Sequence, residues 1–151
     1  MPSRRRVALV TGSSRGLGAA IARCLARDGL AVAVNDRAGE SLELARAIQD
    51  EGGVAGAFTA DVTDERQARE LVAAVTASLG PIDVLVLNAT GPQPEGPLAD
   101  VTWEDHLATV PAGCMGTRED IAEAVSFFAS PGAGFVTGQR LVVDGGRHLG
   151  G

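Results

Sequence analysis

The sequence predicts an α/β fold in which a parallel β-sheet is doubly wound, with helices on both of its faces. Three observations lead to this prediction. Short apolar runs alternate with longer amphipathic segments over the first 88 residues. Glycine closes each of these amphipathic segments, as is usual at helix C-termini. A glycine-rich turn, TGSSRGLG, directly follows the first apolar run. Strands and helices that alternate in this way form βαβ units, whose strands run parallel.

Four strands and three helices are expected in this first part of the chain. The strands cover residues 7–11, 31–35, 54–60 and 84–88, and the helices cover residues 17–28, 39–51 and 64–79. The first run is β-branched and apolar throughout, which is typical of a strand buried on both faces. Leu17, Ile21 and Leu25 recur four residues apart, so the first helix has an apolar face.

The alternation stops after residue 88. A loop with three prolines and two glycines covers residues 89–99, and Thr102 is the expected N-cap of a short helix that follows it. A second loop leads to a helix over residues 117–130, where Thr117 and Asp120 have the spacing of a capping box. A last strand is expected over residues 139–144.

Composition narrows the class of protein. The 151 residues are 45% hydrophobic, which is enough for one domain with its own core. The net charge of −6 gives no general basic field for nucleic acid or for an anionic membrane surface. Cys24 and Cys114 lie far apart, and the apolar run at residues 7–10 is too short for a signal sequence. We therefore expect a single cytoplasmic domain with two reduced thiols and a small-molecule ligand.

The glycine-rich turn is the strongest functional signal. Placed between a strand and a helix, it brings backbone N–H groups and a helix N-terminus against a pyrophosphate. Gly12 permits the turn, Gly16 permits close approach, and Gly18 permits packing of helix on strand. Ser14, Arg15 and Leu17 complete the candidate phosphate loop, and Ser13 and Ser14 are expected to cap the helix or to contact phosphate.

This turn and three later segments together resemble the short-chain dehydrogenase/reductase family, in particular its 3-oxoacyl-carrier-protein reductases. The later segments are Asp61-Val62, LNATG at residues 87–91, and FVTGQ at 135–139 running into VVDGG at 142–146. The resemblance implies a Rossmann-type fold that binds NAD or NADP. It also implies that Asp61 and Val62 contact the adenine, and that Asn88, Ala89 and Gly91 line the ribose and nicotinamide. Without that resemblance, Asp61 could equally be a helix N-cap and Asn88 a turn residue.

The choice between the two dinucleotides depends on three residues. Asp36 ends the second strand, where a carboxylate accepts a hydrogen bond from the ribose 2′-OH and repels a 2′-phosphate, which favours NAD. Arg15 and Arg37 are the residue type that pairs with a 2′-phosphate, which leaves NADP open.

No catalytic residue and no metal ligand can be assigned. The family's activity uses a Tyr and a Lys four residues apart on one helix, together with a Ser, and this chain contains neither Tyr nor Lys. His106 and Cys114 have no identifiable base or orienting partner in the sequence. The order of the motifs indicates an internal deletion near residues 107–110, of roughly a hundred residues on the usual single-domain length. It would remove the fifth strand, the Tyr/Lys helix and the sixth strand of the family.

Such a deletion has consequences for fold and function. We expect one domain over residues 1–151 with a five-stranded sheet in the order 3-2-1-4-7, in which the last strand lies beside the fourth or is exchanged in a homo-oligomer. Three functions stay open. The chain could be an NAD(P)-dependent oxidoreductase acting on a carbonyl or alcohol but retaining little beyond dinucleotide binding. It could be a non-enzymatic nucleotide-binding module or partner of a complete homologue, or an inactive remnant.

Overall fold

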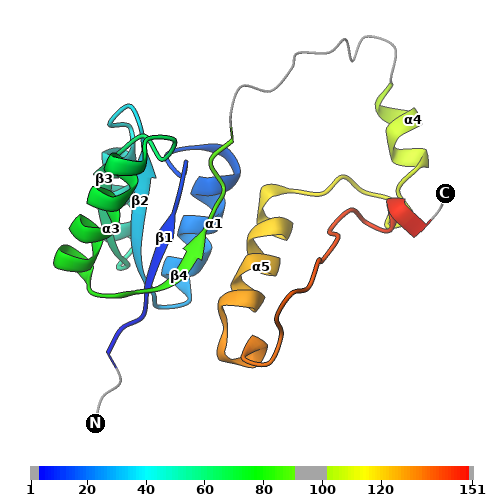
Figure 1. Ribbon diagram of the computed structural model, residues 1–151. Coiled ribbons are helices and arrows are strands. Elements are labelled where there is room, and N and C mark those ends of the chain that lie inside the picture. The colour runs from blue at the N-terminus through cyan, green and yellow to red at the C-terminus, as the bar shows by residue number, and fades with distance from the viewer. Residues whose placement is uncertain (1–3, 91–101, 150–151) are drawn as a thin grey trace.

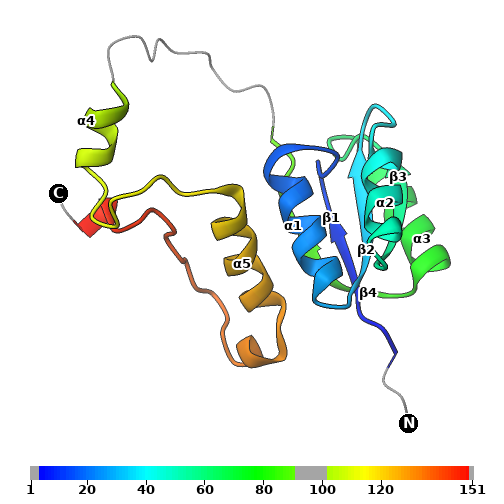
Figure 2. The same ribbon diagram turned by 180° about the vertical axis from the view of Figure 1, so that it is seen from behind.

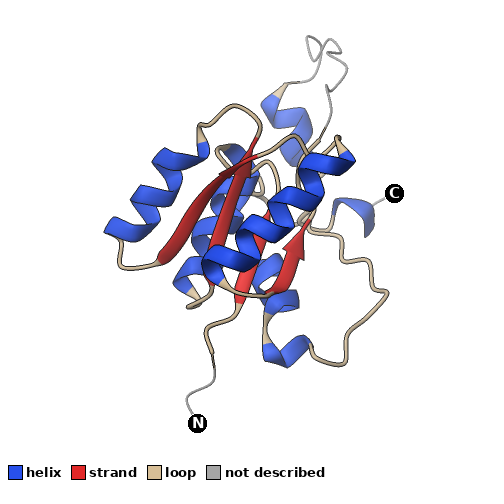
Figure 3. Ribbon diagram, turned by 60° about the vertical axis from the view of Figure 1, so that its left-hand side comes forward, coloured by secondary structure: helices blue, strands red, loops and turns tan. Residues whose placement is uncertain are grey.

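The computed structural model describes residues 4–90 and 102–149, and its centre is a parallel four-stranded sheet in the order β3-β2-β1-β4. The strands are β1 (Val7–Val10), β2 (Ala31–Asp36), β3 (Val54–Thr59) and β4 (Ile82–Val86). The helices are α1 (Gly16–Arg27), α2 (Ser41–Asp50), α3 (Glu65–Leu79), α4 (Trp103–Ala108) and α5 (Arg118–Ala129), with short 3-10 turns η1 (Pro131–Ala133) and η2 (Arg147–Leu149). Figure 3 shows the strands in red with helices on both sides. The predicted α/β class is confirmed.

Two apolar layers hold the sheet, because successive side chains of a strand point to opposite faces. Ala8 and Val10 of β1 face α1, α2 and α5, while Val7 and Leu9 face α3. All four β1 side chains are buried, which confirms the prediction of a strand covered on both faces. Figure 2 shows α1 and α2 side by side over one face of the sheet.

The register brings the carboxyl ends of the strands to one edge of the sheet. Val10 pairs with Val34 and Val86, and Asp36 pairs with Thr59. The strand order reverses direction at β1, because β2 pairs with one edge of β1 and β4 pairs with the other edge. Ligands of open α/β sheets bind at such a switch point, outside the carboxyl ends of the strands.

Helix α5 is fixed to α1 and to the start of β1. Its capping box forms as predicted, since Thr117 accepts from the Asp120 backbone N–H and the Asp120 carboxylate accepts from the Thr117 backbone N–H. Glu123 forms an ion pair with Arg27 at 2.5 Å, and Ser126 donates to Asp28.

The predicted fifth strand does not form, so the order 3-2-1-4-7 is wrong and the described sheet ends at β4. Arg6 donates to the Ala129 carbonyl oxygen at 2.6 Å, which holds the end of α5 at the base of the sheet. The chain then turns through η1, and residues 139–144 lie apart from β4 (Figure 1). Residues 139–144 follow α5 in the chain, and α5 packs on α1 rather than on β4.

The fourth strand also begins and ends two residues earlier than predicted. The Val86 carbonyl oxygen accepts the last ladder bond, from the Thr11 N–H at 3.0 Å. Leu87 and Asn88 therefore lie beyond the strand, in the loop that follows β4. None of the described helices is long and apolar enough to cross a bilayer.

Candidate functional site

The glycine turn joins β1 to α1 in the way the sequence predicts. Gly12 and Gly16 have φ angles of +60° and +61°, a region that side chains with a Cβ rarely adopt. A Cβ on Gly18 would lie 2.5 Å from the Gly12 carbonyl oxygen and 2.6 Å from Asn88 Nδ2, so only glycine fits there. A Cβ on Gly16 would meet nothing within 4 Å, which leaves open space above the turn.

Asn88 ties the end of β4 to this turn. Its side-chain amide donates to the carbonyl oxygens of Thr11 at 3.0 Å and Gly12 at 2.9 Å. The Thr11 hydroxyl in turn accepts from the backbone N–H groups of Asn88 and Ala89. Asn88 is therefore not a local turn residue, because its side chain joins the end of β4 to two carbonyl groups of the glycine turn.

Asn35 and Ser13 hold the buried side of the glycine turn through hydrogen bonds. The sequence analysis did not assign them this role. The buried Ser13 hydroxyl donates to the Val10 carbonyl oxygen at 2.7 Å and accepts from the Asn35 N–H at 3.0 Å. Asn35 donates through its side chain to the carbonyl oxygens of Phe58 and Ala60, which ties β2 to the end of β3. Ser13 therefore neither caps α1 nor is free to contact phosphate. The N-cap of α1 is Arg15, which makes no side-chain cap bond.

Asp36 is a buried carboxylate at the end of β2. One oxygen, Oδ1, accepts from the Gly39 N–H at 2.9 Å and from the Ser41 hydroxyl at 3.4 Å. The other oxygen, Oδ2, is buried and has no hydrogen-bond partner among the described residues. A buried carboxylate oxygen without a partner is costly, so a hydrogen-bond donor that reached Oδ2 would stabilise it.

Asp61 and Val62 follow β3 on the same side of the sheet. The Asp61 carboxylate accepts from the Thr63 backbone N–H and hydroxyl, at 2.9 and 2.7 Å. These two hydrogen bonds hold the pKa of Asp61 below its ordinary value, and the positive charge of Arg37 lowers it further. Asp61 is not the helix N-cap, because Asp64 accepts from the Gln67 N–H and caps α3.

Arg15 and Arg37 lie on the rim of the same cleft. Both residues are exposed, and neither guanidinium makes a hydrogen bond or ion pair with any other residue that the structure describes. The first turn of α1 contains no acidic residue, so the N–H groups at its N-terminus face no negative side chain of their own helix.

These residues line one cleft of about 730 Å³ at the carboxyl end of the sheet. Of the predicted cofactor-binding residues, the lining includes Gly12, Ser14, Arg15, Leu17, Gly18, Asp36, Arg37, Asp61, Val62, Asn88 and Ala89. Gly16 lies in the turn but outside this lining, and Gly91 lies outside the described residues. The lining also includes Asn35, Ala38, Glu40, Ala60, Thr63 and Thr90, which the sequence analysis did not single out.

None of the weaker candidates for chemistry is among the described residues that line the cleft. Cys114 is exposed with a free thiol, and the His106 side chain lies outside what is described. His148 contacts Asp144 at 3.1 Å at the far end of the C-terminal region. Neither Cys114 nor His148 lines the cleft.

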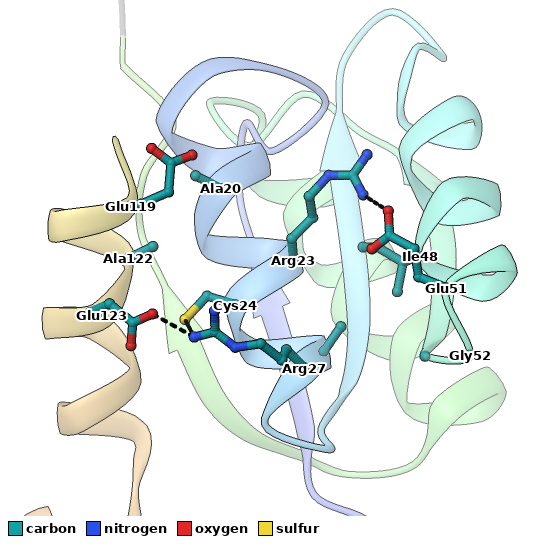
Figure 4. A pocket seen from close by; sticks show the side chains of 12 residues that line it. Ala20, Arg23, Cys24, Arg27, Ile48, Glu51, Gly52, Glu119, Ala122 and Glu123 are labelled. Atoms are coloured by element: carbon teal, nitrogen blue, oxygen red, sulfur yellow. Dashed lines mark hydrogen bonds and ion pairs between the residues drawn. The ribbon is translucent and has the colours of Figure 1, made fainter. Parts of the chain in front are cut away.

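A second hollow of about 480 Å³ lies where α1, α5 and the end of α2 meet (Figure 4). Its charged groups are largely paired with one another: Arg23 with Glu51, and Arg27 with Glu123. Arg27 also donates to the Cys24 sulfur at 3.1 Å, and burial raises the pKa of that thiol. The walls of this hollow thus contain ion pairs that hold helices together.

The parallel sheet, its glycine turn and its switch-point cleft define a Rossmann-type α/β domain. The chain belongs to the short chain dehydrogenase family, whose model matches residues 6–134.

Relatives of known name agree with this assignment. A gluconate 5-dehydrogenase from Gluconobacter oxydans is 42% identical over 170 residues, and the match covers 93% of this chain and 66% of that enzyme. The chain therefore spans less than two thirds of that relative's length, and it covers 12% of a glycine betaine reductase from Emericella nidulans that is 36% identical over 149 residues.

Solved structures give the same fold. A blue fluorescent protein from a metagenomic library, in complex with NADPH, matches with a TM-score of 0.78 and 25% identity, over 95% of this chain and 98% of that one. A gluconate 5-dehydrogenase from Burkholderia cenocepacia, in complex with NADP and tartrate, matches with a TM-score of 0.84 over 97% and 96% of the two chains. Its identity of 24% makes that likeness one of fold.

Proposed function

We propose that the cleft at the carboxyl end of the sheet binds a nicotinamide dinucleotide, with NAD preferred over NADP, and that the chain carries out little or no hydride transfer by itself. The chain would then be the dinucleotide-binding part of an oxidoreductase, from a lineage whose members act on carbonyls or alcohols. Membership of the short chain dehydrogenase family and the NADPH complex of a structural relative support the general ligand class.

The buried Oδ2 atom of Asp36 carries the proposal. Asp36 lines the cleft at the end of β2, where a ribose would be placed, and its buried Oδ2 has no partner among the described residues. A ribose 2′-OH would donate to it, whereas a 2′-phosphate would bring a second negative charge against it. Glu40 and Asp61 add negative charge to the same cleft, and Arg15 and Arg37 add positive charge, so the proposed preference for NAD depends on Asp36 itself.

The remaining predicted residues have matching roles. The N-terminus of α1, with Ser14, Arg15 and Leu17 on the cleft, would hold the pyrophosphate. Asp61 and Val62 would lie against the adenine, and Asn88, Ala89 and Gly91 would lie against the ribose and nicotinamide. When bound, the cofactor supplies a hydride or accepts one.

The residues that would assist this transfer are missing. A proton donor with an adjusted pKa contributes about 10²–10⁴-fold to such reactions, and the family's Tyr and Lys cannot be placed in a chain that has neither residue type. We attribute this to an internal loss near residues 107–110 within one domain over residues 1–151. The ending of the sheet at β4 supports that reading.

Titration with NADH and NADPH, followed by nicotinamide fluorescence and by thermal melting, tests the proposal. A ligand that binds only the folded state raises the melting temperature by mass action. We expect saturable binding of NADH, weaker binding of NADPH, and no turnover with carbonyl substrates. Absence of binding by a chain that melts cooperatively would refute the proposal, and a poorly cooperative melt would favour the inactive remnant. Turnover that appears only on mixing with a complete homologue would identify a partner subunit.

A further inference from the structure

The charged residues of the cleft are distributed unevenly along the edge of the sheet. In the described lining they all belong to the ends of β1, β2 and β3 and the loops after them: Arg15, Asp36, Arg37, Glu40 and Asp61. Arg15 and Arg37 are exposed and make no hydrogen bond or ion pair with any other described residue. The unpaired positive groups of the cleft therefore lie on the side of β1 and β2, away from β4.

The other side of the cleft, after β4, is lined by three described residues, Asn88, Ala89 and Thr90. Both hydrogens of the Asn88 side-chain amide are in use, because Nδ2 donates to the carbonyl oxygens of Thr11 and Gly12. The backbone N–H groups of Asn88 and Ala89 donate to the Thr11 hydroxyl oxygen, at 3.0 and 3.1 Å. The N–H groups of Asn88 and Ala89 are therefore all paired inside the protein, and none is left for a ligand.

The C-terminal part of the chain does not add to this side of the cleft. None of the described residues from 102 to 149 lines the cleft, and the described sheet ends at β4. The loop before α5 is held elsewhere, since the Ala112 N–H donates to the Gly145 carbonyl oxygen at 2.9 Å. Figures 1 and 2 show α4 and η2 away from the strands in both views. In the described structure, the side after β4 thus consists of Asn88, Ala89 and Thr90.

We propose that the cleft recognises the ADP-ribose part of its ligand and gains little affinity from the nicotinamide, so that ADP-ribose, NAD⁺ and NADH bind about equally well. The inference rests on the proposed function, which places a ribose at Asp36 and the pyrophosphate at the N-terminus of α1. The nicotinamide then extends past Asn88 and Ala89, which contact it by packing alone. The ligand class is ADP-ribosyl compounds, whatever group their second ribose carries.

Hydrogen bonding and charge both explain why the nicotinamide contributes little. Its carboxamide has donors and an acceptor that water satisfies in the free ligand. A site selects for such a group only when protein groups replace that water and would stay unpaired without the ligand. The N–H groups of Asn88 and Ala89 are already paired, so they lose nothing when the nicotinamide is absent. The oxidised and reduced rings differ in charge, and no charged residue of the described lining follows β4, so both forms bind alike.

Isothermal titration calorimetry of the full chain with NAD⁺, NADH, ADP-ribose and nicotinamide mononucleotide tests the inference. We expect the dissociation constants of the first three ligands to agree within about threefold, and the mononucleotide to bind at least about tenfold more weakly. ADP-ribose that binds more than about threefold more weakly than NADH, or a mononucleotide that binds as tightly as ADP-ribose, would overturn the inference. A folded chain that binds none of the four ligands would refute the proposed function and, with it, the inference.

Two variants show which side of the cleft supplies the affinity. Asp36→Asn should weaken NADH and ADP-ribose by the same factor, because both ligands carry the ribose that is placed at Asp36. Thr90→Val removes a hydroxyl from the side after β4, and it should keep the ratio of the NADH and ADP-ribose dissociation constants at its wild-type value. Thermal melting without ligand shows whether each variant is folded. A Thr90→Val chain that is folded and loses affinity for NADH alone would overturn the inference, since the nicotinamide would then be recognised after β4.

Discussion

Replacement of Asp36 by asparagine isolates the atom on which the proposed cofactor preference depends. The asparagine side chain keeps the Oδ1 acceptor that receives the Gly39 N–H, and it replaces the unpartnered Oδ2 with a neutral amide nitrogen. The substitution therefore removes a charge from the cleft with almost no change in shape. Asp50→Asn, on an exposed residue at the end of α2, is the matched control.

The expected magnitude follows from the loss of a charged acceptor. A hydrogen bond to a charged group contributes about 1.5–3 kcal/mol and one between neutral groups about 0.5–1.5 kcal/mol. The difference of about 1–1.5 kcal/mol corresponds to a roughly five- to tenfold weaker affinity for NADH. NADPH should bind as well as before or better, because a 2′-phosphate no longer faces the carboxylate.

Nicotinamide fluorescence titrations of wild type, Asp36→Asn and Asp50→Asn with both cofactors measure this preference. Only Asp36→Asn should shift the ratio of the two dissociation constants toward NADPH, and its unliganded melting temperature should stay close to that of wild type. If Asp36→Asn weakens NADH and NADPH equally, Oδ2 does not discriminate at the 2′ position. If it changes neither affinity in a folded chain, the ribose does not lie at the end of β2.

Three further predictions concern stability and reactivity. Gly18→Ala should destabilise the chain by about 1–3 kcal/mol through overpacking, which lowers the melting temperature by about 2–4 °C per kcal/mol. Gly116→Ala is the control and should change the melting temperature little, because a Cβ at Gly116 meets nothing within 4 Å. Equal effects of the two substitutions would contradict the tight packing of the turn at Gly18. The Arg4 guanidinium holds the pKa of Asp83 below its ordinary value, so the ion pair stabilises the fold above a pH of about 4, and this contribution is lost as the pH falls through the lowered pKa. In urea unfolding, the free energy of unfolding of Asp83→Asn should therefore be lower than that of wild type near pH 7, and the two values should converge in acid. A difference that widens in acid would contradict this prediction. Iodoacetamide should modify the exposed Cys114 first. It should modify Cys24 only on unfolding, because that thiol is buried and its pKa is raised by burial. Early label on Cys24 in mass spectrometry would contradict its burial.

The sequence was most informative where a local pattern decides the structure. Apolar runs, terminating glycines and the Thr117–Asp120 spacing predicted the first four strands and the long helices to within about two residues, because period and capping act within one element. The glycine turn predicted its own conformation, because a positive φ at Gly12 and the lack of room for a Cβ at Gly18 require glycine.

Long-range hydrogen bonds were not predictable in the same way. Nothing in the order of residues says that Asn35 supports the end of β3 or that Ser13 is buried beneath the turn. The fifth strand was predicted from the segment over residues 139–144 and from the resemblance to the family, but a strand forms only where a partner edge is within reach. The docking of α5 on α1 decides this for residues 139–144, and that docking depends on pairs such as Arg27 with Glu123, which lie 96 positions apart.

The hydrogen bonds from Asn88 to the glycine turn also affect the order in which the molecule can fold. They join residues 77 and 76 positions apart, and they close the largest loop within the sheet. The first three strands pair through nearer contacts and can assemble earlier, because short loops close at lower entropic cost. The glycine turn acquires its final geometry only when β4 has joined β1. A growing chain would thus complete the cleft at the carboxyl end of the sheet late, in the same step that completes the sheet.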